Sequence, residues 1–281
     1  PVAACRADSC GLNLTRYLWM GAGGLAFAVG TIGIAEAIKA APTGYDMVMG
    51  QKDNLVVAPW LYGNLPWDPT KDLVPVAHVA YTPVVIATAA NSRFKTLADV
   101  VAAAKAAPDT ITYGSPGNGT TIHLAGNLFE KAAKVDIRHI PYKGVGPMVT
   151  DLLGGQIDFG VVALPSVAQH IKSGALRAIG MCADKRTQAA PDIPTFIEQG
   201  LTGYNMEAWF AVIGPKGLSA AQIKRVHDGV VAAFNDPGVK ETMAKQGNTI
   251  SVSSTEQAQK AFRSELARYA ALVKKAGIEP Q

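Results

Sequence analysis

Short apolar, strand-like stretches alternate with helical patterns through the middle of this sequence, and each strand-like stretch ends in a loop rich in glycine, serine or proline. Strands that alternate with helices indicate parallel pairing with right-handed crossovers, and hence an α/β fold. In sheets of this kind, ligands bind outside the carboxyl ends of the strands, which is where these loops are expected to lie. The expected strands cover residues 111–115, 138–142, 157–163 and 176–183.

Helices with clear start signals flank this alternating unit. Three of them carry the capping-box pattern, in which a Ser or Thr is followed three residues later by an acidic or amide side chain. The three patterns begin at Thr96, Ser219 and Ser254. Two apolar extended stretches, 74–90 and 206–214, bracket the unit and are expected to be crossings between two lobes. A chain of 281 residues suits one large domain or two of moderate size.

The amino-terminal region has two features of its own. Cys5 and Cys10 either form a small disulfide loop, which fits an oxidising compartment, or are incidental thiols. Residues 18–35 hold no charge and follow Arg6 and Arg16, as the apolar part of a signal peptide or a membrane span would. Glycines lower the hydrophobicity of this stretch, so we expect a glycine-rich loop that runs into a buried helix.

The charge pattern and the known motifs exclude several classes of protein. The net charge is +4, and the Lys and Arg residues are spread along the chain without a basic run, so no nucleic-acid partner is expected. A mild positive balance suits an anionic ligand. The sequence has no Gly-x-Ser-x-Gly motif and no histidine pair with metal spacing on a helix. We therefore expect no catalytic residue, no metal and no cofactor.

The loop from Gly114 to Thr121 is the strongest local signal for a binding site. Its glycines let backbone N–H groups approach a ligand closely. Its last two residues would begin a helix, where free N–H groups and the helix dipole favour an anion. The alternative is a tight turn with Asn118 or Thr120 as a simple N-cap. The candidate ligand-binding residues of this loop are Ser115, Asn118, Gly119, Thr120 and Thr121.

Five further positions near these loops are candidates. His123, just inside the helix, either orients the loop or donates to the ligand, and Lys143 either faces an anion or lies on the surface of a turn. Asp158 either contacts an amino group of the ligand or caps a neighbouring loop. Leu164 and Pro165 lie where a strand meets a helix, so backbone N–H groups there can bind an anion by the same argument.

At these residues the sequence resembles the Bug family, the solute receptors of tripartite tricarboxylate transporters. The most specific stretch runs Tyr113-Gly-Ser-Pro-Gly-Asn-Gly-Thr-Thr-Ile-His-Leu124. The resemblance extends from about Gly30 to the C-terminus, while residues 1–29 lack the strand, the Pro/Gly-rich loop with an Asp and the helix with which the family begins. The other matching stretches are 40–50, 59–73, 140–144, 151–159, 185–195 and 203–210.

The resemblance implies a type II periplasmic binding protein fold, with two α/β lobes, a double crossover and a ligand cleft between the lobes. Lobe I is then expected to cover residues 1–87 and 209–281, and lobe II residues 88–208. Members of the family hold a small organic or amino-acid carboxylate between two opposed loops, one from each lobe. The lobe II loop maps onto the loop described above, and a lobe I loop maps onto residues 50–54, where Gln51 and Asn54 are candidates.

The resemblance also implies the function. We expect a monomeric periplasmic protein that captures a carboxylate, closes over it by a hinge motion and delivers it to the membrane permease subunits of a tripartite tricarboxylate-type transporter. Such a protein is not an enzyme. One alternative is a ligand-sensing receptor for signalling, and another is a hydrolase, which requires a nucleophile and a base in contact.

Overall fold

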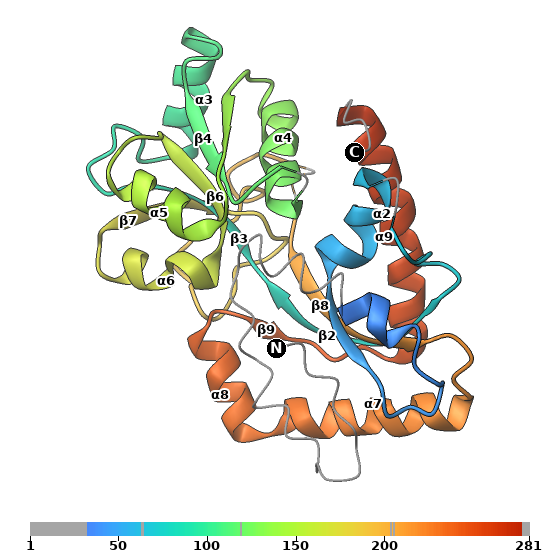
Figure 1. Cartoon of the computed structure of the whole chain (residues 1–281). Coiled ribbons are helices and arrows are strands. Elements are labelled where there is room, and N and C mark those ends of the chain that lie inside the picture. Colours follow the sequence, from blue (N-terminus) through green and yellow to red (C-terminus); the bar gives the residue numbers. More distant parts are fainter. Residues whose placement is uncertain (1–32, 63–64, 119, 203, 205, 277–281) are drawn as a thin grey trace.

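The computed structural model describes residues 33–62, 65–118, 120–202, 204 and 206–276. The strands in these ranges form two separate sheets, one in each part of the molecule (Figure 1). We call the four-stranded sheet with its covering helices the four-stranded unit, and the five-stranded sheet with its covering helices the five-stranded unit.

The four-stranded sheet has the order β1-β8-β2-β9. The strand β8 is central and pairs antiparallel with both β1 and β2, and β9 pairs antiparallel with β2. The strands are β1 (Val48–Gln51), β2 (Leu73–Thr82), β8 (Ala208–Pro215) and β9 (Thr249–Ile250).

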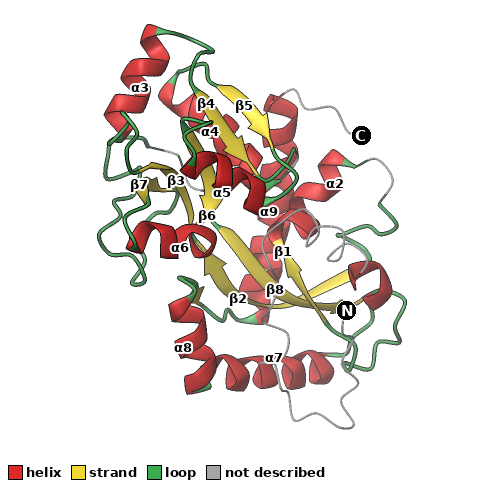
Figure 2. Cartoon of the chain, turned by 60° about the vertical axis from the view of Figure 1, so that its left-hand side comes forward, coloured by secondary structure: helices red, strands yellow, loops and turns green. Residues whose placement is uncertain are grey.

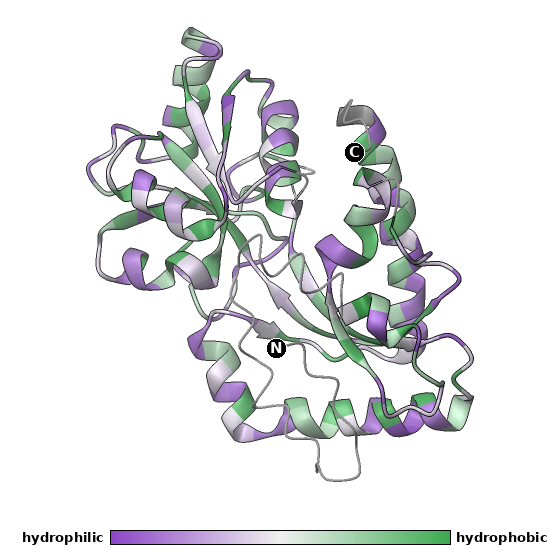
Figure 3. Cartoon of the chain, in the orientation of Figure 1, coloured by the Kyte–Doolittle hydropathy of each residue, from purple (hydrophilic) through white to green (hydrophobic). Residues whose placement is uncertain are grey.

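Helices cover both faces of this sheet because successive residues of a strand point to opposite sides. On one side, Val212 of β8 packs in a cluster with Phe234 of α7 (Ala220–Asn235) and with residues of α8 (Pro237–Lys245). On the other side, Ala211 and Ile213 pack with Leu266 of α9 (Thr255–Ala276). In Figure 3, α7 alternates hydrophobic and hydrophilic residues, as expected for a helix with one buried face.

The five-stranded sheet has the order β5-β4-β6-β3-β7. As expected, β4 pairs parallel with both β5 and β6. The expectation of parallel pairing throughout the unit is wrong where β6 and β7 meet β3, a strand from the stretch expected to be a crossing, because both pair antiparallel with it. The reason is that β3 follows β2 directly, without a crossover helix that would bring it round in the parallel direction. The strands are β3 (Val84–Ala89), β4 (Thr112–Ser115), β5 (Arg138–Pro141), β6 (Phe159–Ala163) and β7 (Leu176–Met181).

In the described ranges, four helices belong to the five-stranded unit. Tyr113 of β4 packs in a cluster with Phe129 of α4 (Thr121–Ala133) and with apolar residues of α3 (Leu97–Ala106). Val162 of β6 points the other way and packs with Met148 of α5 (Val145–Leu153) and Val167 of α6 (Leu164–Lys172). Figure 2 shows α5 and α6 in front of this sheet.

The chain passes between the two sheets twice, as expected from the apolar stretches 74–90 and 206–214. It leaves the four-stranded sheet at Pro83, between β2 and β3, and returns at β8. Before the return, Tyr204 is fully buried and its hydroxyl donates to the carbonyl of Ala125 in α4 at 3.0 Å. Cys182 is also fully buried and packs as a small residue of the core.

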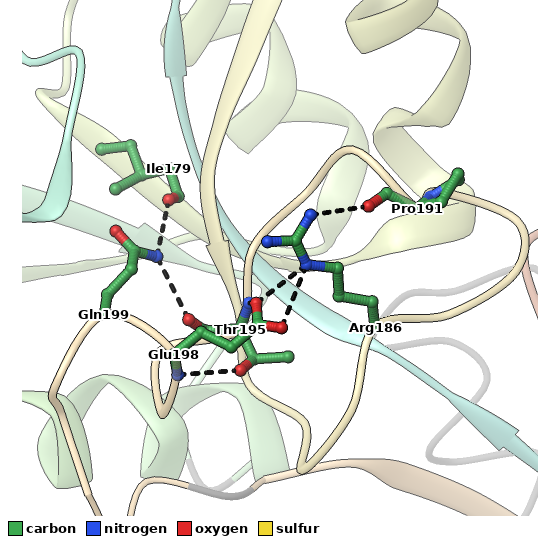
Figure 4. A network of polar contacts seen from close by, with 6 residues as sticks. All are labelled: Ile179, Arg186, Pro191, Thr195, Glu198 and Gln199. Carbon is green, nitrogen blue, oxygen red and sulfur yellow. Dashed lines mark hydrogen bonds and ion pairs between the residues drawn. The ribbon is translucent and has the colours of Figure 1, made fainter.

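The loop between β7 and the return crossing is held by an ion-pair network (Figure 4). The Arg186 guanidinium contacts the Glu198 carboxylate at 2.8 Å and donates to the carbonyl of Pro191 at 3.0 Å. Glu198 also accepts from the backbone N–H of Thr195 at 2.8 Å. The Gln199 amide donates to the carbonyl of Ile179 in β7 at 3.1 Å, so this loop is fastened to its own sheet.

All three capping boxes expected from the sequence are present. Thr96 and Ser219 begin α3 and α7 with reciprocal hydrogen bonds. Ser254 precedes α9, and its hydroxyl and backbone N–H both bond to Gln257. The cysteine pair and most of residues 18–35 lie outside the described residues, while Ile34 is buried in a short helical turn. None of the helices in the described ranges combines the length and hydropathy of a membrane span.

Candidate ligand-binding site

Three loops meet at one edge of the five-stranded sheet. Because β4, β5 and β6 run parallel, their carboxyl ends lie at the same edge, with Ser115 opposite Pro141 (Figure 2). Backbone hydrogen bonds then join two of the loops: Tyr142 N–H donates to Ser115 O, and Gly144 N–H donates to Pro116 O, each at 3.0 Å. The structure therefore gathers the predicted loops where the alternating pattern placed them.

The start of α4 is organised by Thr120. Its hydroxyl accepts from the backbone N–H of His123 at 3.1 Å and donates to the carbonyl of Gly117 at 3.0 Å. Gly117 has φ +151°, a conformation that side-chain-bearing residues rarely adopt. The N-cap interpretation of Thr120 is thus confirmed, and its contact with a ligand stays a prediction.

The next residue, Thr121, donates to a carboxylate. Its backbone N–H donates to Asp53 Oδ1 at 3.0 Å, and its hydroxyl donates to the same oxygen. Asp53 belongs to the four-stranded unit, where it begins a short π-helix, η2 (Asp53–Val57), just after β1. Thr121 is 1% exposed, so this contact is buried between the two units. The start of α4 therefore does hold a carboxylate, but one that the chain itself supplies.

Burial controls the electrostatics around Asp53. Desolvation raises the pKa of its carboxyl from 3.8 to about 6, while the hydrogen bond from Thr121 and the nearby Lys52 act in the opposite direction. Lys52 is itself buried, and desolvation lowers the pKa of its ammonium group. It donates to the carbonyl of Glu207 at 2.7 Å and pairs with Glu265 of α9 at 3.2 Å. A buried cation thus ties the end of β1 to the return crossing and to α9.

A column of rings stands beside Ser115. Its hydroxyl lies 2.7 Å from His139 Nε2, and the His139 ring stacks between Tyr113 and His123, with ring centroids 4.7 and 4.3 Å apart. Desolvation and the adjacent His123 lower the pKa of His139 to about 4, and desolvation also lowers that of His123. The stack therefore holds Ser115 in place, which supports the orienting role expected of His123.

Ser115 and His139 also bear on the hydrolase alternative, because a nucleophile and a base are in contact. Among the described residues, however, no carboxylate hydrogen-bonds to the His139 ring, and Ser115 is fully buried. A histidine with a pKa of about 4 is also a weak base at neutral pH. The described part of the chain holds no cluster of His, Cys, Asp and Glu suited to a metal ion.

Several candidates lie elsewhere or have other partners. Asp158 precedes β6 and accepts from the backbone N–H of Thr112 at 2.9 Å, at the amino edge of the sheet, so it is not brought together with Ser115. Leu164 follows β6 at the carboxyl edge, but its N–H donates to the carbonyl of Pro83 at 2.8 Å. Pro165 follows it within the first turn of α6, and as a proline it has no N–H to offer.

The remaining candidates differ in their exposure and in the elements that hold them. Asn118 and Lys143 are exposed, and Gly119 lies outside the described residues. Gln51 ends β1 opposite Phe210, and Asn54 is buried in η2. Sequence reasoning selected these two and missed Asp53, which lies between them, because nothing local indicates that its carboxylate reaches α4.

Comparison with known proteins gives consistent matches. Residues 23–278 match the family described as tripartite tricarboxylate transporter family receptor. The chain is 32% identical to Protein BugT of Bordetella pertussis over 97% of this chain and 82% of that protein. It is similar to the solved structure of the periplasmic binding protein BugD, with 29% identity, a TM-score of 0.76 and coverage of 93% of this chain and 86% of BugD.

A second solved structure, R. palustris Rpa4515 with adipate, has 26% identity and a TM-score of 0.79, with coverage of 90% of this chain and 85% of that chain. Together with BugD it confirms the two-lobed α/β periplasmic binding fold that the sequence predicted.

Proposed function

This chain belongs to the tripartite tricarboxylate transporter receptor family, and from that premise we propose that it captures a small organic or amino-acid carboxylate and delivers it to the membrane subunits of a transporter of that type. It is a periplasmic solute-binding receptor and not an enzyme, because the family and its structural neighbours are solute-binding proteins. A sensing role in signalling would use the same capture step and stays a prediction.

One observation carries the proposal: the donors at the start of α4 already hold a carboxylate between the two units. The backbone N–H and the hydroxyl of Thr121 both point at one carboxylate oxygen, in a place shielded from water. Charge-assisted hydrogen bonds to a carboxylate are the stronger kind, and a helix start favours negative charge. The chemistry of this position therefore suits a carboxylate ligand.

The ligand class draws further support from a relative. The Rpa4515 structure contains adipate, a dicarboxylate, in a protein of the same fold. We propose that the ligand lies at the carboxyl edge of the five-stranded sheet, which we call the loop edge, near Ser115, Thr120, Thr121 and His123. On its other side the ligand would face Gln51 at the end of β1. Lys143, Asn118 and Gly119 would line the outer side of the same edge.

Binding is proposed to close a hinge in a monomeric protein. The chain crosses between the units at Pro83 and before β8, so these two segments are the natural hinge. We place the first lobe boundary at Pro83, because β3 pairs within the five-stranded sheet. This boundary lies a few residues before the one expected between residues 87 and 88. The second boundary stays at 208/209.

The proposal is tested by a thermal-shift screen over carboxylates, because a ligand that binds the folded state raises the apparent melting temperature. The panel comprises succinate, malate, adipate, citrate, L-glutamate and benzoate, with the matching amides as uncharged controls. We expect at least one carboxylate to stabilise the protein, with its amide inactive. If no member of the panel shifts the melting temperature and calorimetry detects no binding, the proposal is wrong.

Matched substitutions at two helix starts then test the site. Thr120→Ala, combined with Ser115→Ala, should weaken binding of the active carboxylate by about tenfold in calorimetry, since it removes donors and loosens the loop. Thr96→Ala removes the N-cap of α3 in the same unit and should cost a similar ~1 kcal/mol of stability with unchanged affinity. Equal affinities for the two variants would contradict the site.

A further inference from the structure

The Asp53 carboxylate occupies the position at the start of α4 that the proposed function assigns to the ligand. Both donors of Thr121 point at Asp53 Oδ1, and Thr121 itself is 1% exposed. An N–H group and a hydroxyl each donate one hydrogen bond. A ligand carboxylate therefore cannot take these donors while Asp53 keeps them.

Asp53 and a ligand carboxylate also exclude each other electrostatically. Two negative charges at one helix start repel, and the repulsion is stronger where water is scarce. The local cation does not remove this conflict: the Lys52 ammonium is engaged by Glu265 and by the carbonyl of Glu207. The two carboxylates are thus alternatives at this position.

The described contacts of Asp53 allow it to move away. The hydrogen bonds that its carboxylate accepts both come from Thr121, in the opposite unit. On its own side it follows Lys52, the N-cap residue of η2, which makes no side-chain cap hydrogen bond. The carboxylate is therefore held by the same contact that opens when the two units separate.

We propose that Asp53 is an internal competitor that occupies the α4 start in the ligand-free protein and that a ligand carboxylate must displace. This inference rests on the carboxylate-binding function proposed above and adds to it a residue that lowers affinity. It follows that removing the Asp53 carboxylate strengthens binding, which is the opposite of what removal of a ligand-contacting residue does.

The test measures the affinity of Asp53→Ala and Asp53→Asn by calorimetry, with adipate, malate, citrate, L-glutamate, succinate and benzoate as probes. Both variants should bind the active probe about tenfold more tightly than the unmodified chain, since one charge-assisted competitor is gone. The Asn variant tests the inference if Asp53→Ala does not fold, because its amide can still accept from Thr121 without a negative charge. Asp192→Ala, at an exposed position, is the control for loss of one negative charge and should leave affinity unchanged.

A second substitution, Thr121→Ala, distinguishes competition by Asp53 from a general effect of removing the Asp53 charge. In the unmodified chain, Thr121→Ala removes a donor from both the ligand and its competitor, so its effect on affinity is partly cancelled. In the Asp53→Ala background only the ligand loses the donor, so Thr121→Ala should weaken binding several-fold more. Equal effects of Thr121→Ala in the two backgrounds would overturn the inference.

The outcomes distinguish the two proposals. If a probe binds the unmodified chain and the Asp53 variants bind it equally or more weakly, the competitor assignment is wrong while the receptor function stands. Weaker binding would instead make Asp53 a contact of the ligand. If no probe binds the unmodified chain or any variant, the carboxylate-binding function itself fails.

Discussion

The helices α4 and α6 both begin at the carboxyl edge of the five-stranded sheet, yet their first N–H groups have different partners. In α4 the N–H of Thr121 binds a side-chain carboxylate from the other unit, whereas in α6 the N–H of Leu164 binds the backbone carbonyl of Pro83 at the crossing. A side-chain carboxylate can rotate away and can be replaced by a ligand. A carbonyl of the crossing moves only if the chain itself moves, so α6 begins at a structural joint.

The two helix starts also differ in the kind of interaction that holds them: apolar packing at α6 and an ionisable group at α4. The Leu164 side chain is 2% exposed and lies in the apolar cluster under α5 and α6, beside Gly247 of the four-stranded unit. The partner of Thr121 is instead an ionisable group with a raised pKa. We infer that the start of α4 is the exchangeable position and the start of α6 the fixed one.

The largest effect that tests this difference is expected at α6. Leu164→Ala leaves a cavity between the units and should lower the free energy of unfolding by about 3 kcal/mol in chemical denaturation, while the folded variant keeps its carboxylate affinity. Leu153→Ala, at an exposed leucine that ends α5, should cost far less. A loss of affinity in Leu164→Ala would place the start of α6 in the binding site and break the comparison.

A smaller effect is expected from the titration of Asp53. Burial raises the pKa of Asp53 from 3.8 to about 6, so this carboxyl ionises at a lower pH in the unfolded chain than in the folded chain. The free energy of unfolding therefore falls as the pH rises from about 4 to about 6. Asp53→Asn should therefore gain about 1 to 2 kcal/mol relative to the unmodified chain between pH 4 and pH 7. The gain stays below the full value of the pKa shift because the Asp53 side chain keeps some exposure to solvent.

The measurement is a series of denaturant titrations across this pH range. Asp192→Asn serves as the exposed control and should show no such gain. A gain of the same size in both variants would mean that net charge, and not the contact with Thr121, is responsible.

The smallest effect is expected at the opposite edge of the sheet. Asp158→Ala removes the bonds from the N–H and hydroxyl of Thr112 and should cost about 1 kcal/mol of stability. Its carboxylate affinity in calorimetry should not change, because Asp158 lies at the amino end of β6. Weakened binding would show that the ligand reaches beyond the loop edge.

Much of the local structure could be predicted from the sequence because its hydrogen bonds span only a few residues. Thr96 and Ser219 form their capping boxes with partners three positions away, and Thr120 caps α4 through His123 in the same way. The loop edge was also predictable, since parallel strands joined by helices bring their carboxyl ends together. The antiparallel direction of β3 was not, because no local pattern records which sheet a strand joins.

The candidate site shows the same division. Ser115 and Thr121 were selected from the glycine-rich loop, and the structure places both at the loop edge, buried. Their partners were missed: His139 is 24 residues from Ser115, and Asp53 is 68 residues from Thr121. Asp158 was included because a polar residue in an apolar strand suggests a site, but strand order puts it at the other edge.

The sequence by itself determined where capped helices begin and which loops follow strands. It also determined which N–H groups at the start of α4 have no hydrogen-bond partner within the helix. Only the tertiary structure decided which groups those donors meet. The physical reason is range: a cap is complete within one turn of helix, whereas the contact of Asp53 with Thr121 exists only after two sheets have folded and packed together.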